Sequence, residues 1–394
     1  MDKRIIFFLL SQNLSTFGTS VVGYSIMWHV TLETSSGMWI TFFTLAASAP
    51  LLVTSLVGGV LADKHNRKYL IMLSDGFSAL STVILIVFFL AGGRSLTVVL
   101  ALSILRSAGN GLQMPAVTAL YPQLVETEKL TRIQGINQSV SSVLMLLSPA
   151  VGGLLLGSVG LIGSFFIDIA TASSAILVMA TIKIERVPSE TKQESIFKEL
   201  RKGMRFIASE KMLLKLMYFY SISIFLVTPA AVLTPLMVRR SFGDAVWMLT
   251  ANEIVWTLGM LFGGVFVSVK GKFADKLRTS AISVICFGIL FALLGVAPNF
   301  PIYLAFIGLS GIFMPILNTA GTVYIQERVQ ADMLGKVFSL IIFIGNAAMP
   351  VAILLFGPMS DVVRIEHILI VTGALLVAVG CVFIASVSRR TTEH

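Results

Sequence analysis

Apolar runs of membrane-spanning length recur along the whole chain, and they limit its fold more than any other feature. A helix needs about 20 apolar residues to cross the hydrocarbon core of a bilayer. Of the 394 residues, 56% are hydrophobic and only 12% are charged, whereas soluble domains have about 25% charged residues. The runs do not alternate apolar and polar residues as the strands of a membrane barrel do. We therefore predict an all-α integral membrane protein.

The polar breaks between these runs predict twelve transmembrane helices, which we expect to form two six-helix pseudo-symmetric bundles. The expected spans are 5–30, 38–62, 69–92, 95–120, 135–157, 161–182, 213–236, 247–269, 279–296, 301–325, 337–357 and 365–388.

The longest polar stretch inside the chain divides six predicted spans from six. We expect an N-terminal six-helix bundle over 1–182, a cytoplasmic linker over 183–212 and a C-terminal six-helix bundle over 213–394. Within the linker, apolar residues recur every three or four positions from Ile196 to Ile207, and basic residues fill the positions between them. This pattern predicts an amphipathic helix that lies on the membrane lipid.

Two short glycine motifs occur once in each half. Residues 111–115, near the end of the predicted fourth span, recur as 311–315 near the end of the tenth, and Gly58-Gly59-Val60 recurs as Gly263-Gly264-Val265. Parallel repeats of this kind are typical of transporters in which a central cavity lies between two bundles. The repeats therefore favour an alternating-access transporter.

Basic residues indicate the orientation of the chain in the membrane. Most of the 29 Lys and Arg residues fall on segments that are cytoplasmic if the N-terminus is inside, and the outer loops carry only Arg94, Arg239, Arg240 and Arg364. The positive-inside rule then predicts a multi-pass membrane protein with both termini cytoplasmic. Because topology accounts for the net charge of +9, we expect no nucleic-acid partner.

Motifs for catalysis or metal binding are not found in the sequence. The four His residues are scattered, the two Cys residues fall inside predicted helices, and no ligand spacing or nucleophile motif is present. We therefore expect no enzyme activity, no cofactor and no metal.

The segment after the second predicted span reads Gly59-Val-Leu-Ala-Asp63-Lys-His-Asn66-Arg67-Lys68. It resembles the signature G-x-L-a-D-r-x-g-r-r/k of the major facilitator superfamily, which implies a gating role in which Asp63 holds the inner gate shut. Gly59 is expected to permit close helix packing, and Asn66 to adopt the left-handed turn that Gly supplies in the family. The alternative for the basic residues is a loop that only sets topology.

A second motif, Ser148-Pro149-Ala-Val-Gly152-Gly153 in the fifth predicted span, resembles the antiporter motif G-P-x-x-G-G of drug exporters in this superfamily. The resemblance implies export. Pro149 removes a backbone donor and is expected to bend the helix, while the glycines allow another backbone to approach. A helix kink without a functional role is the alternative.

Four ionisable residues are predicted to lie within the membrane, where charges are costly and usually functional or paired. Arg106 resembles the Arg of the family's R-x-x-q-G motif, which is associated with proton coupling, although a structural ion pair is the alternative. Asp75 and Asp168 fall on spans that the resemblance places outside the cavity, which favours structural roles. We expect Glu253, in the eighth span, to carry the proton.

Polar side chains on the first and seventh spans are candidates for the cavity lining, because the resemblance implies that these helices face the cavity. They are Gln12, Asn13, Tyr218 and Tyr220. Hydrogen bonds between helices are the alternative role for each.

Within the superfamily, stretches such as 105–109 and 252–264 are similar to bacterial macrolide-efflux proteins of the drug:proton antiporter branch. This resemblance implies proton-coupled efflux of amphipathic, macrolide-like drugs by a protein whose partners are a small amphipathic substrate, protons and membrane lipid. It also implies a location in the bacterial inner membrane. We expect a monomer. An exporter of a siderophore or lipid is the main alternative, followed by a nutrient importer.

Overall fold

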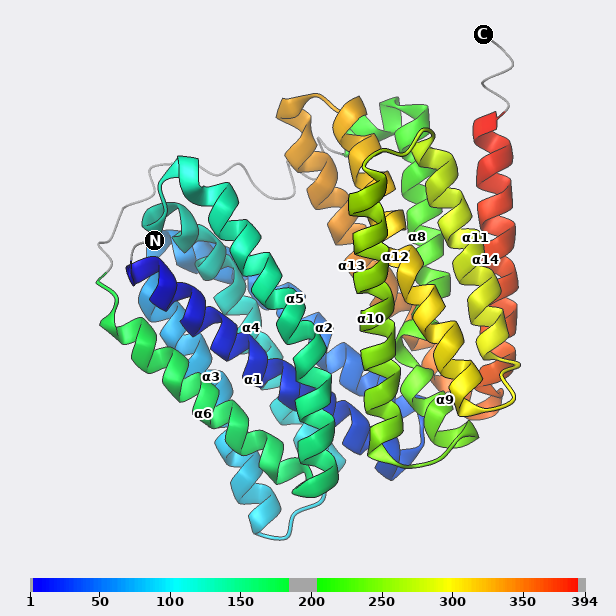
Figure 1. Cartoon of the computed structure of the whole chain (residues 1–394). Coiled ribbons are helices and arrows are strands. Elements are labelled where there is room, and N and C mark those ends of the chain that lie inside the picture. Colours follow the sequence, from blue (N-terminus) through cyan, green and yellow to red (C-terminus); the bar gives the residue numbers. More distant parts are fainter. Residues whose placement is uncertain (1–2, 184–203, 389–394) are drawn as a thin grey trace. The chain divides into compact units, whose positions relative to one another are not determined.

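The computed structural model of the chain describes residues 3–183 and 204–388, and nearly all of these are helical (Figure 1). The helices are Lys3–Thr34 (α1), Gly37–Lys64 (α2), Arg67–Leu90 (α3), Leu96–Leu124 (α4), Thr127–Ser158 (α5), Gly160–Thr181 (α6), Lys211–Val232 (α8), Thr234–Ser241 (α9), Val246–Lys270 (α10), Lys276–Leu294 (α11), Phe300–Arg328 (α12), Ala331–Val362 (α13) and Ile365–Ser388 (α14). Most of the amphipathic helix expected in the linker lies outside the described residues.

Among the described residues, 10 helical segments are long and apolar enough to cross a bilayer. The helices over the other two expected spans, α4 and α13, have 29 and 32 residues but are not among these 10. The all-helical class predicted from the sequence is therefore found, and a multi-pass membrane protein follows from it.

The seventh expected span, 213–236, differs from the structure. It consists of α8 and then the short α9, which begins after Leu233 and reaches Ser241. Pro235 lies at the start of α9, a position that proline favours because its missing N–H is not needed there.

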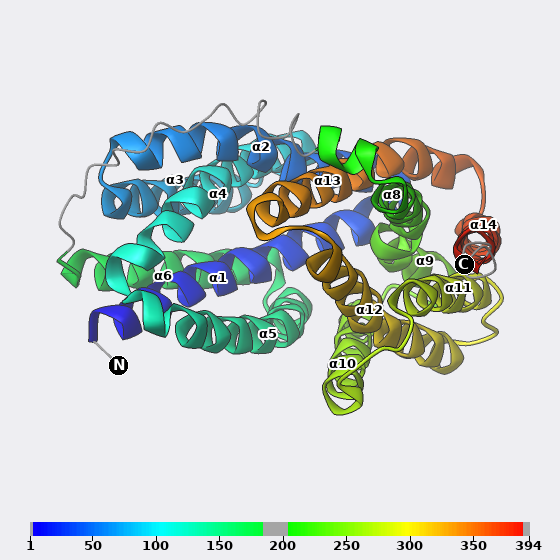
Figure 2. The same cartoon turned by 90° about the horizontal axis from the view of Figure 1, so that it is seen from above.

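The described chain divides into two compact units. Unit 1 contains α1 to α6 without the turn at Ser35–Met38; unit 2 contains that turn and α8 to α14 without Ala245–Thr250. Within unit 1, α1 packs beside α6 and α3 beside α4 (Figure 2). Within unit 2, α11 packs against both α12 and α14.

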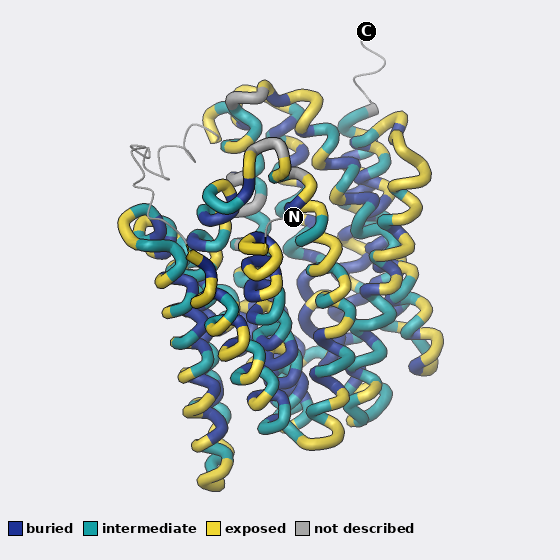
Figure 3. Tube along the Cα trace, turned by 60° about the vertical axis from the view of Figure 1, so that its left-hand side comes forward, coloured by how far each residue is buried: buried dark blue, intermediate teal, exposed yellow. Residues whose placement is uncertain are grey.

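Each helix buries one face and exposes another, as the alternating colours along the tubes in Figure 3 show. Apolar core clusters of unit 1 gather around Phe8 and Leu120 and around Leu85 and Phe165. The exposed faces carry large apolar side chains, such as Leu73 at 70% exposure and Leu154 at 69%, which a protein surrounded by lipid tolerates.

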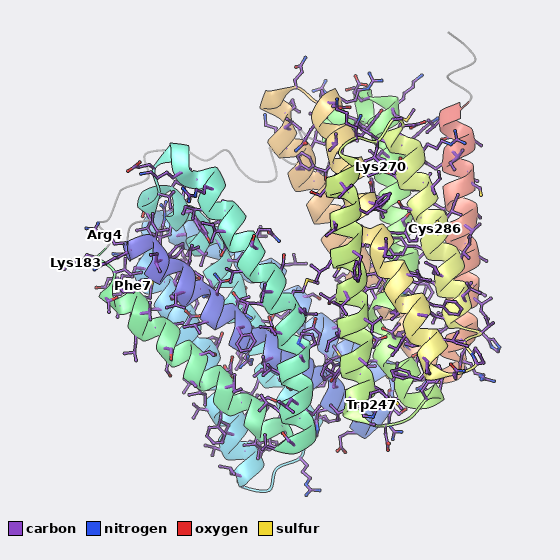
Figure 4. All side chains as sticks on the ribbon, in the orientation of Figure 1. Arg4, Phe7, Lys183, Trp247, Lys270 and Cys286 are labelled. Atoms are coloured by element: carbon purple, nitrogen blue, oxygen red, sulfur yellow. The ribbon has the colours of Figure 1, made fainter. Side chains whose placement is uncertain are left out.

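Labelled residues in Figure 4 mark the ends of several helices. Arg4 and Lys183 lie at the same end of unit 1, and Trp247 and Lys270 mark the two ends of α10. Because α10 has 25 residues, it is about 37 Å long, which is enough to span a bilayer.

The repeated glycine motifs make equivalent helix contacts in the two units. A Cβ added at Gly58 on α2 would lie 2.9 Å from Leu112 Cα on α4, and one added at Gly263 on α10 would lie 3.0 Å from Ile312 Cα on α12. By contrast, a Cβ at Gly59 would meet nothing within 4 Å. The expectation that Gly59 permits close packing is therefore wrong, because Gly58 occupies the face of α2 that meets α4.

Candidate functional site

Arg106 and Asp168 form an ion pair inside unit 1. The guanidinium of Arg106, on α4, contacts the carboxylate of Asp168, on α6, and the hydroxyl of Thr82, on α3. The Thr82 hydroxyl also donates to Asp168 Oδ2 at 2.6 Å. Arg106 is 6% exposed and Asp168 3%. Arg106 therefore has an ion-pair partner within unit 1, and its role in proton coupling stays a prediction.

The same arginine borders a small cavity of 140 Å³ between α1, α2 and α4, together with Ser107 and Asn110. Its aliphatic neighbours there include Val22 and Ile26. Arg106 therefore contacts α6 and α3 from α4 and also lines this cavity.

Asp75 is buried on α3 without a basic partner among the described residues. Its Oδ1 accepts hydrogen bonds from the Ser15 hydroxyl at 2.6 Å and from Gln113 Nε2 at 2.9 Å. Its Oδ2 is buried and accepts no hydrogen bond from any residue that the structure describes. Asp75 therefore differs from Asp168, whose charge is paired.

Gln12 and Asn13 line a polar cavity of 370 Å³ in unit 1. The cavity is bordered by α1, α4 and α5, and Asn13 Nδ2 donates across it to Asn137 Oδ1 at 3.1 Å. Both residues therefore line a cavity within unit 1, and their predicted place in a central cavity between the bundles stays a prediction.

Glu253 lines a largely apolar cavity of 300 Å³ in unit 2. Aromatic rings form much of its wall: Trp256 from α10 and Phe287 and Phe291 from α11. The ring centroids of Phe287 and Phe291 are 5.4 Å apart. Met314 and Met349 add soft, adaptable side chains from α12 and α13, which suits ligands of varied shape.

A short chain of hydrogen bonds orients the Glu253 carboxyl group. The Tyr303 hydroxyl donates to Asn252 Oδ1 at 2.9 Å, and Asn252 Nδ2 lies 3.3 Å from Glu253 Oε1. No Lys or Arg in the described part of the chain forms an ion pair with Glu253, which is therefore the acid of this cavity without a fixed counter-charge.

The two tyrosines predicted for the cavity have different environments. Tyr220 lines the unit 2 cavity, and its hydroxyl donates to Leu317 O at 3.2 Å. Tyr218, two residues earlier on α8, is 58% exposed. Because residues two apart on a helix face different directions, only one of the pair turns toward the cavity.

The signature loop binds the ends of several helices together. Arg67 Nη1 donates to Ala119 O at 2.8 Å, and Lys68 Nζ donates to Ala180 O and Ile182 O at 2.7 Å each. The latter carbonyls lie at the end of α6, where a cation is favourable. The closest approach of Asp63 to Arg67 is 3.9 Å, a long and partly exposed pair.

One local expectation for this loop was wrong. Asn66 has φ −68° and ψ 115°, which is extended backbone, and its Oδ1 accepts from Lys68 N–H at 3.0 Å. Asn66 therefore caps the start of α3, a position that Asn favours, and no left-handed turn is needed.

The antiporter-like motif lies inside α5, which continues as a helix on both sides of Pro149. A Cβ at Gly152 would lie 3.2 Å from Val21 O on α1, and one at Gly153 would lie 3.1 Å from the Trp28 ring. Ser148 is 1% exposed, and its hydroxyl has no hydrogen-bond partner among the described residues. The two glycines therefore allow α5 to approach α1 closely.

Several polar residues of these cavities were not singled out from the sequence. In unit 1 they are Gln113, Gln134 and Asn137, and in unit 2 Asn252, which accepts a hydrogen bond from Tyr303. The only signal for the first group was an unusual density of amides on two otherwise apolar helices. Their convergence depends on which helix faces meet.

Comparison with known proteins identifies the family. A profile of the Major Facilitator Superfamily matches residues 8–353, which is most of the chain. The chain therefore belongs to the Major Facilitator Superfamily, and it is a membrane transporter rather than an enzyme.

Similar sequences extend over nearly the same length. "Macrolide efflux protein A" of Streptococcus pyogenes is 26% identical over 375 residues, covering 94% of this chain and 93% of the relative. The protein of the same name from Enterococcus faecalis is 28% identical over 75% of this chain and 93% of its own length. "Multidrug efflux pump Tap" of Mycolicibacterium fortuitum is 22% identical, covering 93% of this chain and 91% of the pump.

Solved transporter structures share the fold. A bacterial homologue of the iron transporter ferroportin in an inward-facing state matches with a TM-score of 0.71 at 14% identity, over 97% of this chain and 98% of that one. The peptide transporter POT in complex with sulfate matches with a TM-score of 0.74 at 11% identity, over 99% of this chain and 95% of that one.

Proposed function

We propose that this chain is a proton-coupled exporter of amphipathic, macrolide-like drugs that works by alternating access. The observation that carries the proposal is the unit 2 cavity, whose wall is mostly aromatic and aliphatic. The wall contains one carboxyl group, that of Glu253, which forms no ion pair with another described residue. Apolar walls with few, placed polar groups are typical of pockets for drug-sized ligands. Relatives named for macrolide and multidrug efflux support the same direction and cargo.

Glu253 is the proposed proton carrier. A carboxylate without a counter-charge is costly in an apolar surrounding, and binding a proton or a cationic cargo removes that cost. Arg106, Asp75 and Asp168 are further candidates for the proton path, and of these only Asp75 has no oppositely charged partner in the described residues. In the proposed cycle, the protein takes cargo from the cytoplasm or inner leaflet, releases it outside and returns carrying a proton.

The gating role is assigned to Gly59, Asp63, Arg67 and Lys68, with Asp63 as the latch of the inner gate. The export direction rests on Ser148, Pro149, Gly152 and Gly153.

We also propose that twelve spans form two six-helix bundles over 1–182 and 213–394, joined by the 183–212 linker, with both termini in the cytoplasm of a bacterial cell. The protein is proposed to act as a monomer in contact with membrane lipid.

The direct test is cellular accumulation of labelled erythromycin and of ethidium, with and without the protein and with and without a protonophore. Cells that contain the protein should accumulate less of one or both compounds, and the protonophore should abolish the difference. Cells producing Glu253→Gln at equal membrane abundance serve as the matched control. Equal accumulation of both compounds in all cells would contradict drug export and favour a siderophore or lipid as cargo.

A further inference from the structure

Unit 1 contains a cavity whose chemistry differs from that of the Glu253 cavity. The polar part of its wall consists mainly of amide side chains, and we call it the amide cavity. The amide residues are Gln12, Asn13, Asn110, Gln113, Gln134 and Asn137. Its volume, 370 Å³, falls within the range of about 300–1,000 Å³ that is typical of small-ligand pockets.

Three helices turn one polar face each toward this cavity. On α4 the lining residues recur from Asn110 through Gln113 and Val117 to Tyr121, and on α5 they are Gln134, Asn137 and Ser141. Spacings of three and four residues place side chains on one face of a helix. The amides therefore converge because three helix faces meet, and single side chains folded inward do not account for the arrangement.

The amides retain capacity for further hydrogen bonds. Asn13 Nδ2 donates to Leu9 O at 2.8 Å and to Asn137 Oδ1, and Gln113 donates to Asp75. For the side chains of Asn110 and Gln134, no hydrogen bond to another described residue is formed. Since each amide group has two donors and an acceptor with two lone pairs, the cavity can both donate to a ligand and accept from it.

The lining residues disfavour two classes of ligand, charged groups and purely apolar groups. None of the lining residues carries a carboxylate or a basic side chain, so a charged group would lose water on entry without gaining a counter-charge, which is unfavourable. A purely apolar group would leave the amides without partners, and unpaired buried polar groups are costly. Hydroxyl groups match the amides, because a hydroxyl also donates and accepts.

We propose that the amide cavity binds the uncharged, polyhydroxylated part of an amphipathic cargo, such as a glycosyl group. This inference rests on the proposed export of amphipathic molecules and names the chemical class of the cargo. Met114, which is 63% exposed, and Val117 lie among the amides and supply apolar contact for the carbon-bearing faces of such a group.

The test compares phlorizin, a glucoside, with phloretin, the same molecule without its glucose. Binding of each to the full-length protein in lipid nanodiscs is measured by equilibrium dialysis. The wild-type protein should bind phlorizin about tenfold more tightly, because several hydrogen bonds to the glucose hydroxyls each contribute modestly. Equal affinity for the two compounds would overturn the inference.

Two variants locate the binding. Gln134→Leu combined with Asn137→Leu removes amides from the cavity, and it should abolish the preference for phlorizin while phloretin binding stays unchanged. Gln138→Leu is the matched control, because Gln138 is an exposed amide on α5 outside the cavity lining, and this variant should keep the preference. Thermal unfolding of each variant, and the milder Asn137→Ala, control for misfolding.

The outcomes separate this inference from the proposed function. Proton-driven export without a preference for phlorizin overturns the amide-cavity inference alone. A preference for phlorizin that the double variant abolishes, in a protein that shows no proton-driven export, overturns the proposed function alone. A preference that survives in the double variant places glucoside binding elsewhere and also overturns the inference.

Discussion

Arg106 on α4 and Asp168 on α6 neutralise each other inside unit 1, where both side chains are almost fully buried. Thr82 on α3 contacts both partners, so three helices meet at this pair. A buried ion pair contributes little compared with an apolar replacement, but removing one partner leaves an unpaired buried charge. Replacing only one member of the pair should therefore destabilise the protein more than replacing both.

Asp168→Asn should destabilise the protein strongly. The substitution keeps the size of the side chain and leaves the Arg106 charge without compensation, which costs about 3–5 kcal/mol in buried pairs. Thermal unfolding of the purified full chain in nanodiscs measures the effect. The double variant Arg106→Gln with Asp168→Asn should recover part of the loss, with a coupling energy above about 1 kcal/mol. If Asp168→Asn unfolds at the wild-type temperature, the pair has no structural role.

Glu253→Gln should separate substrate movement from proton movement. The amide preserves the shape of the side chain but neither releases nor binds a proton at physiological pH. In proteoliposomes, transport of erythromycin driven by a pH gradient should fall to background, whereas exchange of labelled for unlabelled erythromycin should continue. Glu366→Gln is the control, because Glu366 accepts hydrogen bonds from Ser241 and Arg364 near the start of α14. Gradient-driven transport by Glu253→Gln at the wild-type rate would exclude Glu253 as the proton carrier.

The sequence predicted the helices well because apolar runs of about 20 residues have few alternative structures. The errors occur at helix ends, whose positions depend on local capping. The predicted seventh span is divided into α8 and α9 at Leu233, and Asn66 caps α3 in an extended conformation. Hydropathy does not report such details. Charged residues within the helices were also recognisable, because Arg106, Asp75, Asp168 and Glu253 interrupt apolar spans.

The sequence shows that these charged residues lie within the spans, but it does not show which of them pair. Arg106 and Asp168 are 62 residues apart in the chain, and their contact depends on the rotation of α4 and α6 about their axes. The same holds for Gly58 and Gly59, of which only the first faces α4. Successive residues on a helix point about 100° apart, so an error of one residue assigns a side chain to a different face. Predicted spans alone therefore do not decide which residues line a cavity.

Asp63→Asn should abolish transport with little change in stability. The Asp63–Arg67 pair is long, at 3.9 Å, and partly exposed, and such pairs contribute about 0–1 kcal/mol. Efflux from cells and the unfolding temperature of the purified protein are measured together. Glu126→Gln is a suitable control, since Glu126, just before α5, pairs at 2.7 Å with Lys129 in the first turn of that helix, outside the signature loop. Wild-type efflux by Asp63→Asn would remove Asp63 from the gate.

Adjacent glycines in the two repeats should respond oppositely to a single added methyl group. In Gly263→Ala the new Cβ would lie 3.0 Å from Ile312 Cα, and in Gly58→Ala it would lie 2.9 Å from Leu112 Cα. Both contacts are with backbone, which does not move aside as a flexible side chain does, so each substitution should destabilise the protein by about 1–3 kcal/mol.

The neighbouring substitutions Gly264→Ala and Gly59→Ala place the methyl group where nothing lies within 4 Å. Because Ala favours helix over Gly by up to about 1 kcal/mol, these two variants should unfold at the wild-type temperature or slightly above it. Thermal unfolding of all four proteins under one condition makes the comparison. Equal behaviour of Gly263→Ala and Gly264→Ala would contradict the close approach of α10 to α12, and equal behaviour of Gly58→Ala and Gly59→Ala would contradict that of α2 to α4.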